Sequence, residues 1–238
     1  LVMGPDCGTA ILNGVNLGFA NRVPRGPIGI VGASGTGTQE VSCILANQGV
    51  GVSHAIGTGS RDLSLDVGGI MSEAGLRLLA SDEGTSVIVL VAKHPAEAVA
   101  ERMHGVLLDL GKPAVVRYLG KPGQGTRDGI LYAGSLDEAA FAAIDLCSGR
   151  TPKPVDLAAT AAAIAPSLRG AGGGKRLVGL FGGGSLASEA KLVLSGVGID
   201  ARTPGKPLKA GMAIEEPGHL VVDTGDDFYT VGRPHPMI

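Results

Sequence analysis

Residues 28–40 have the sequence IGIVGASGTGTQE, and this stretch decides the fold. Strand-forming apolar residues run into a turn of glycine, serine and threonine, and a helical pattern follows. Such a turn leaves the first N–H groups of the helix unpaired at the positive end of the helix dipole, where phosphate and carboxylate groups bind. We therefore predict an anion site made by Ser34, Gly35, Thr36, Gly37 and Thr38.

A second turn further along the chain repeats this design. Residues 177–189 have the sequence LVGLFGGGSLASE, which predicts another strand, turn and helix. The predicted anion-binding residues there are Gly182, Gly183, Gly184 and Ser185. The two helix ends either face one anion or form two separate anion sites. Both turns also have a purely structural interpretation, because Ser and Thr cap helices and Gly permits tight turns.

Short apolar runs alternate with helix-period segments between the two turns. We expect strands at 28–32, 52–56, 86–91 and 114–119, and helices at 38–48, 65–79, 96–110 and 136–147. This alternation predicts an α/β fold in three layers, with a parallel sheet between helices on both faces. The number of strands favours the flavodoxin-like strand order.

Composition excludes several classes of function. The chain has 238 residues, 40 of them glycine, with 3% aromatic residues and a formal net charge of −2, which gives no reason to expect nucleic acid or a membrane as partner. Its three cysteines are widely spaced, so neither a disulfide framework nor a metal site is visible. No signal peptide and no run long enough to span a bilayer are present, and we predict a cytoplasmic protein.

The pattern also divides the chain. It is irregular up to residue 26, and residues 151–174 contain prolines, an alanine-rich stretch and a closing glycine cluster, as linkers do. After this linker we expect strands at 177–181 and 220–223 and a helix at 185–194. Because this last unit has too few elements to close a core, we interpret the chain as a piece of a longer polypeptide.

Five phrases carry a resemblance to a known family. They are LVMGPDCGTA, GPIGIVGASGTGTQE, HAIGTGSRDLSLDVGG, GSLDEAA and DDFYTVGRPHPMI, and they cover nearly the whole chain. The chain resembles the succinyl-CoA synthetase superfamily of nucleotide-dependent acyl-CoA ligases, and within it the FdrA-type acyl-CoA synthetase-like proteins. In the ligases a phosphohistidine moves between two helix N-termini, one from each subunit, and the two turns of this chain resemble those helix ends.

The resemblance implies four segments. Residues 1–26 would be the end of a Rossmann CoA-binding-like domain, and 27–150 a flavodoxin-like ligase domain. A linker at 151–174 would lead to the start of a second, β-subunit-like flavodoxin-like domain at 175–238, which is truncated. Gly4, Pro5 and Asp6 would lie where the ligases hold CoA, although Asp6 replaces an asparagine and its carboxylate repels phosphate.

The chain departs from the ligases where their phosphohistidine stands. The corresponding residues 125–130 have the sequence GTRDGI, and no histidine lies between His104 and His219. The ligase glutamate that orients the phosphohistidine is also missing, because residues 92–96 have the sequence AKHPA. Since a covalent relay needs both groups, we do not expect the ligase mechanism.

Several charged residues are candidates for substrate contact. Arg233 suits the grip of a carboxylate or phosphate and His235 suits proton transfer, with Asp226 nearby as a third catalytic candidate. Arg61 and Lys93 follow predicted strands at the ligand edge of the sheet and are candidate substrate contacts, although Asp62 or Ser64 beside Arg61 could simply cap a helix. We expect packing or surface roles for His54, His94, His104 and His219.

Three hypotheses for function follow. FdrA-type proteins resemble a component of the oxamate carbamoyltransferase of allantoin (purine) degradation. This resemblance implies transfer of a carbamoyl or acyl group between a small carboxylate amide (oxamate or oxalurate) and phosphate. The protein would bind phosphate or acyl phosphate, and partner subunits would complete the enzyme. The alternative is a genuine nucleotide-dependent acyl-CoA ligase, with CoA as cofactor and a different phosphate acceptor. The third hypothesis is a non-catalytic anion-sensing or scaffolding subunit.

Overall fold

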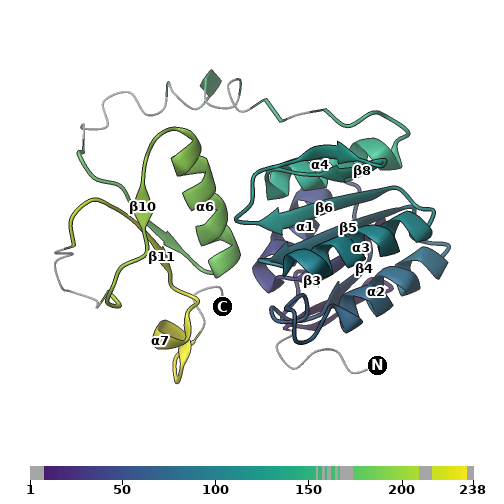
Figure 1. Cartoon of the computed structure of the whole chain (residues 1–238), viewed down its shortest axis with the longest axis horizontal. Helices are drawn as coiled ribbons and strands as arrows, with labels where there is room; N and C mark the ends of the chain where they lie inside the picture. The colour runs from purple at the N-terminus through teal and green to yellow at the C-terminus, as the bar shows by residue number, and fades with distance from the viewer. Residues whose placement is uncertain are drawn as a thin grey trace. The chain divides into compact units, whose positions relative to one another are not determined.

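The computed structural model describes residues 8–153, 155–156, 159, 162–163, 166, 174–208 and 216–234 (Figure 1). The chain divides into two compact units, Leu1–Lys153 and Pro154–Ile238. The boundaries predicted after residues 26, 150 and 174 stay predictions.

The first unit is built on one eight-stranded sheet. Its order is β2 (Val15–Gly18), β1 (Thr9–Leu12), β4 (Val52–Gly57), β3 (Arg25–Ala33), β5 (Val87–Lys93), β6 (Ala114–Leu119), β8 (Ile130–Tyr132) and β7 (Gly125–Arg127). The five strands from β4 to β8 are parallel to one another. Taken along the chain, these five have the order 2-1-3-4-5, so the predicted flavodoxin-like order is confirmed.

Helices cover both faces of this sheet, as the three-layer prediction requires. On one face α1 (Gly35–Asn47) packs beside α4 (Leu136–Cys147), and on the other α2 (Ile70–Ser81) packs beside α3 (Glu97–Asp109) (Figure 1). Alternate strand residues face opposite layers. The core against α2 and α3 contains Leu76, Leu79 and Met103 from the helices and Ile88, Leu90, Ala92, Val116 and Tyr118 from the strands.

Two edge hairpins were absent from the sequence prediction. β1 and β2 pair antiparallel to each other, and β1 pairs antiparallel to β4, so the irregular stretch before residue 26 contributes to the same sheet. β7 and β8 form a second hairpin around Asp128, whose φ is 51°. Strands of three or four residues with exposed positions give little periodic signal, which explains why the pattern missed them.

The prediction that a helix begins at residue 65 was wrong. The chain forms turns there, and α2 begins at Ile70 after Gly69, whose φ of 79° is a left-handed conformation that favours glycine. The helix predicted at 38–48 begins earlier, at Gly35. The helix at 136–147 and the strand at 114–119 have the predicted bounds.

The second unit contains a three-stranded parallel sheet in the order β10 (Ala201–Arg202), β11 (His219–Asp223) and β9 (Val178–Phe181). Its helices are α6 (Gly184–Gly196) and α7 (Asp227–Thr230). The predicted elements β9, α6 and β11 are confirmed, whereas β10 and α7 are too short to be visible in the sequence. Within the described residues of the whole chain, every helix is too short or too polar to cross a membrane.

One lysine ties the end of α2 to the following strands. Lys112 Nζ donates hydrogen bonds to the carbonyl oxygens of Leu79 at 3.0 Å, Asp82 at 2.7 Å and Thr85 at 2.7 Å. A cation at the C-terminus of a helix also interacts favourably with the helix dipole.

Replacing this lysine should destabilise the first unit. We expect Lys112→Met to lower the free energy of unfolding by about 2 kcal/mol, because three carbonyl groups lose a charged donor. Chemical denaturation measures this change. Lys153→Met, at an exposed lysine outside these contacts, is the control and should change stability by less than about 0.5 kcal/mol. Equal stabilities of the two variants would contradict the prediction.

Candidate functional site

The strand order makes the carboxyl ends of β3 and β5 the expected place for a ligand. In the flavodoxin-like order, consecutive connections leave for opposite faces at this pair of strands, and ligands bind where they diverge. α1 follows β3 here, Lys93 is the last residue of β5, and His94 follows it. Two predicted features, the turn at 34–38 and Lys93, therefore share one edge of the sheet.

The turn before α1 is held by its own hydroxyl groups. Ser34 is the N-cap, and its Oγ accepts a hydrogen bond from Gly37 N at 3.2 Å. Thr38 Oγ1 donates to the Ser34 carbonyl oxygen at 2.8 Å, and both side chains are buried. Gly35 and Thr36 occupy the first two helical positions, whose N–H groups have no acceptor within the helix, and they are exposed and half-buried. The candidate donors to an anion are therefore the N–H groups of Gly35 and Thr36, with the Thr36 hydroxyl beside them.

Two glycines allow this tight arrangement by lacking a side chain. A Cβ atom added at Gly32 would lie 1.8 Å from Thr38 Oγ1, and one added at Gly37 would lie 2.6 Å from Ser34 Oγ. Real atoms do not approach so closely. Gly32 and Gly37 are thus required for the packing of the turn itself.

Lys93 lies on the same face of the sheet as α1. Ala92 belongs to the core on the α2 and α3 side, so its neighbours Val91 and Lys93 face the other layer. Val91 Cγ1 indeed lies 2.9 Å from where a Cβ of Gly37 would be. Because Lys93 stands two residues beyond Val91, at the last position of β5, its half-buried side chain leaves the sheet beside the N-terminal turn of α1.

His94 follows β5 directly and has a φ of 39°, in the left-handed region that non-glycine residues adopt less often. It is exposed, and its ring packs against Gly120, where an added Cβ would lie 2.8 Å from His94 Cε1. These observations agree with the packing or surface role expected from the sequence.

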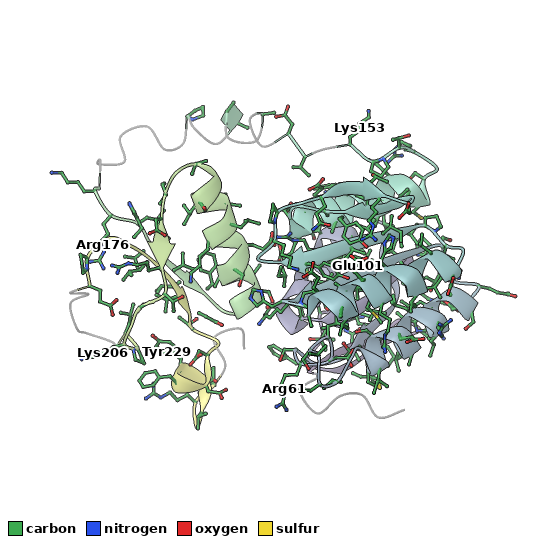
Figure 2. All side chains as sticks on the ribbon, in the orientation of Figure 1. Arg61, Glu101, Lys153, Arg176, Lys206 and Tyr229 are labelled. Carbon is green, nitrogen blue, oxygen red and sulfur yellow. The ribbon has the colours of Figure 1, made fainter. Side chains whose placement is uncertain are left out.

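The segment after β4 contains a buried acid, Asp62, next to an exposed base, Arg61. Asp62 is buried, and its carboxylate accepts hydrogen bonds from Met71 N at 3.1 Å, Ser72 N at 2.8 Å and Ser72 Oγ at 2.6 Å. The capping interpretation of this loop is therefore confirmed for Asp62. Arg61 is exposed on the same edge of the sheet (Figure 2). Its contact with a substrate stays a prediction.

In the second unit the turn at 182–185 also opens a helix. Gly183 is the N-cap of α6 and has no side-chain capping bond, so the N–H groups of Gly184 and Ser185 stand at the uncapped start of a 13-residue helix. Ser185 itself is buried. Since the two predicted turns belong to different units, a shared anion stays a prediction.

The predicted catalytic residues lie mostly near α7. Asp226 is its N-cap, and Asp226 Oδ1 accepts from Phe228 N at 3.0 Å. Arg233 is exposed just after this helix, and its N–H donates to the Thr230 carbonyl oxygen at 3.0 Å. His235, Gly4, Pro5 and Asp6 lie outside the described residues. Among the residues that the structure describes, no cluster of three or more His, Cys, Asp or Glu side chains could hold a metal ion.

One family of known proteins matches part of the first unit. The CoA binding domain family matches residues 25–116, from β3 to β6. This doubly wound segment is therefore similar to CoA-binding domains. The CoA-binding-like domain end expected at residues 1–26 stays a prediction.

The whole chain is 40% identical to the uncharacterized protein YahF of Escherichia coli K12 over 256 aligned residues, which cover 100% of this chain and 47% of YahF. The chain thus spans about half the length of this curated relative.

Three solved structures share a distant similarity with the chain. PH0766 of Pyrococcus horikoshii is 19% identical with a TM-score of 0.45, covering 59% of this chain and 32% of its own. The dinucleotide-forming acetyl-coenzyme A synthetase 1 of Ca. Korarchaeum cryptofilum, in complex with phosphate and ADP, is 20% identical with a TM-score of 0.43, covering 85% and 44%. The ATP citrate lyase of Methanosaeta concilii is 16% identical with a TM-score of 0.41, covering 71% and 30%.

The two glycines near the turn provide a matched test of its packing. We expect Gly32→Ala to lower the free energy of unfolding by roughly 2–3 kcal/mol, because its methyl group collides with the Thr38 hydroxyl. Gly35→Ala should cost less than about 0.5 kcal/mol, because the nearest atom to its added Cβ is 3.7 Å away. Thermal unfolding of both variants measures the difference. A tolerated Gly32→Ala would show that the turn is not packed in this way.

Glu40 in α1 makes stability depend on pH. Burial raises the pKa of this carboxyl, and the nearby Asp137 carboxylate of α4 raises it further. The folded chain therefore binds a proton more tightly than the unfolded chain, and the free energy of unfolding falls as pH rises from 4.5, the ordinary pKa, through the raised pKa.

Glu40→Gln removes this charge and should raise Tm near neutral pH by roughly 1–2 °C, with the gain disappearing in acid, where both proteins are neutral at this position. Thermal melts over a pH series measure the effect. Glu83→Gln, at an exposed glutamate, serves as control. A lower Tm of Glu40→Gln at neutral pH would contradict the prediction.

Proposed function

We propose that this chain is part of an enzyme that transfers a carbamoyl or related acyl group between a small carboxylate amide and phosphate. The observation that carries the proposal is the N-terminal turn of α1, whose first two N–H groups have no acceptor within the helix. This turn lies at the carboxyl edge of β3 and β5, with Lys93 on the same face of the sheet. The exposed N–H groups and the helix dipole favour an anion by about 1 kcal/mol, and a nearby ammonium adds to this.

Phosphate would bind at this turn through Gly35 N and Thr36 N, with Lys93 balancing its charge. One phosphate oxygen would attack the carbamoyl carbon of oxalurate, and the bond from that carbon to the amide nitrogen would break. The products would be carbamoyl phosphate and oxamate, with a proton supplied to the leaving nitrogen. In the second unit, Arg233 and His235 are candidates for carboxylate binding and proton transfer. The pathway suggested by the resemblance is allantoin degradation.

The segment that corresponds to the ligase phosphohistidine supports a mechanism without a phosphoenzyme. Arg127 forms two hydrogen bonds of 2.7 Å with the Glu101 carboxylate, and Asp128 Oδ2 lies 3.0 Å from His104 Nε2. This hairpin is thus bound to α3. Since Leu131 pairs with Val115, near the start of β6, the hairpin tip lies at the amino edge of the sheet, opposite the α1 turn.

A nucleotide-dependent acyl-CoA ligase is the second candidate. The match of residues 25–116 to the CoA binding domain family favours it. The backbone donors before α1 fit a phosphate group of CoA or nucleotide as well as free phosphate, so the turn alone does not separate the two candidates. A non-catalytic anion-binding subunit is the remaining alternative.

Phosphorolysis of oxalurate tests the proposal. The intact protein, combined with its partner subunits, should form carbamoyl phosphate from oxalurate and phosphate. Lys93→Met should lower kcat/KM for phosphate about tenfold, as expected for loss of about 1.4 kcal/mol of charge stabilisation. Lys153→Met, at an exposed lysine away from this edge, is the control and should leave turnover unchanged.

Each alternative gives a different result. Transfer of label from a nucleoside triphosphate to the protein would favour the ligase. Unchanged turnover in the double variant Ser34→Ala and Thr36→Ala, together with Lys93→Met, would favour the non-catalytic role. Failure to form carbamoyl phosphate with any combination of subunits would exclude the transferase.

A further inference from the structure

The second unit contains a pocket of its own at the carboxyl ends of β10 and β11. The pocket has a volume of about 220 Å³, and its walls come from the segment after β10 and from the end of β11 with α7. It is lined by Thr203, Pro204, Gly205, Lys206, Pro207, Val222, Asp223, Asp226, Phe228 and Tyr229. Lys206 lies in the segment after β10 and Tyr229 in α7 (Figure 2). The carboxyl edge of a parallel sheet is the usual place for a ligand.

Hydrogen bonds fix the walls of this pocket. Tyr229 Oη accepts from Leu208 N at 2.8 Å, which ties the segment after β10 to α7. The Glu216 carboxylate accepts from Gly205 N at 3.1 Å and from Lys206 N at 3.3 Å. Because these bonds are already formed, a ligand would not have to order the pocket, and preorganisation of this kind favours affinity.

The pocket combines two acids, one base and an aromatic wall. Asp223 Oδ1 accepts from Gly225 N at 2.9 Å and Asp226 Oδ1 from Phe228 N at 3.0 Å. A carboxylate has about four acceptor sites, so both groups keep capacity for N–H donors of a ligand. The ammonium of Lys206 suits a carboxylate. The rings of Phe228 and Tyr229 pack edge to face with centroids 5.2 Å apart and supply the apolar wall.

The size of the pocket limits the ligand. Pockets for drug-sized molecules and cofactors measure roughly 300–1,000 Å³. A volume of about 220 Å³ suits a compound much smaller than CoA or a nucleotide. A simple dicarboxylate would bring its second negative charge against Asp223 and Asp226, which disfavours it.

We infer that this pocket binds a small carboxylic acid that also carries N–H donors, with the carboxylate at Lys206 and the N–H groups at Asp223 and Asp226. Amides, ureido acids and amino acids share this chemistry. The inference deepens the proposed function, on which it rests for the choice of oxamate as probe, by assigning the carboxylate amide to the second unit.

Calorimetric titration of the intact protein with three probes tests the inference. Oxamate and oxalate have the same size, but oxamate carries an amide where oxalate carries its second carboxylate. Glycine represents the amino acids. We expect oxamate to bind at least tenfold more tightly than oxalate. Tighter binding of glycine than of oxamate would assign the pocket to an amino acid.

Variants of the pocket residues test the contacts of the two ends of the ligand separately. Lys206→Met should weaken oxamate at least tenfold. Asp223→Asn and Asp226→Asn keep an acceptor for Gly225 N and Phe228 N, so the fold should survive, which thermal unfolding would verify. Both should weaken oxamate several-fold and strengthen oxalate, because they remove a repelling charge. Lys175→Met, at an exposed lysine outside the pocket, should change neither affinity.

Two results would overturn the inference. One is the absence of binding by oxamate and glycine at millimolar concentration, and the other is equal binding of oxamate by the parent protein and the pocket variants. The outcome is separable from that of the proposed function. Carbamoyl phosphate formed at unchanged rates by the pocket variants would refute the pocket alone, whereas oxamate binding without carbamoyl phosphate formation would refute the transferase alone.

Discussion

The contact between Gly32 and the Thr38 hydroxyl determines how β3 passes into α1. Only a hydrogen atom fits between the two, and Thr38 in turn donates to the Ser34 carbonyl oxygen at 2.8 Å. Ser34 Oγ meanwhile accepts from Gly37 N. The hydroxyl groups of Ser34 and Thr38, which the sequence suggested as ligands, form the turn, so backbone N–H groups would be held in place before an anion binds. Such preorganised donors need no reorientation when charge binds.

The strand order gives this turn its surroundings. β3 stands between β4 and β5, and the helices that follow β3 and β5, α1 and α3, lie on opposite faces, so the last residue of β5 shares an edge of the sheet with the α1 turn. Lys93 brings a positive charge there. His94 follows in a left-handed conformation, which costs of order 1 kcal/mol and has to be offset by packing elsewhere. The adjoining Gly120 provides room for the imidazole ring.

Periodicity predicted the long elements of the fold and failed at the short ones. The central strands are buried on both faces and form continuous apolar runs, which is why β5 and β6 were visible from sequence. The edge strands β2 and β7 are exposed and of four and three residues, so tertiary pairing rather than local pattern creates them. The start of α2 was misplaced because residues 65–69 form turns, and the helix begins only after Gly69, with Asp62 accepting from the N–H groups of its first turn.

The same contrast applies to the candidate site. A strand that ends in Gly and Ser predicted the turn before α1, because that signal is local, whereas anion binding by the turn stays a prediction. The position of Lys93 beside this turn follows from sheet register, and the left-handed conformation of His94 follows from packing, neither of which the sequence displays. The pocket after β10 was invisible for a further reason, since β10 has only two residues and α7 only four.

The hairpin at 125–130 bears on how phosphate could be handled. Arg127 is paired with Glu101, and His104 bridges the Asp128 carboxylate and the Tyr132 hydroxyl, at 3.0 and 2.7 Å. Release of this segment would leave the buried His104 without its partners, which costs more than an exposed contact of the same kind. We therefore do not expect this hairpin to act as a mobile carrier of phosphate. Under the proposed function, phosphate reacts where it binds, and the carboxylate amide has to be brought to it by a second site.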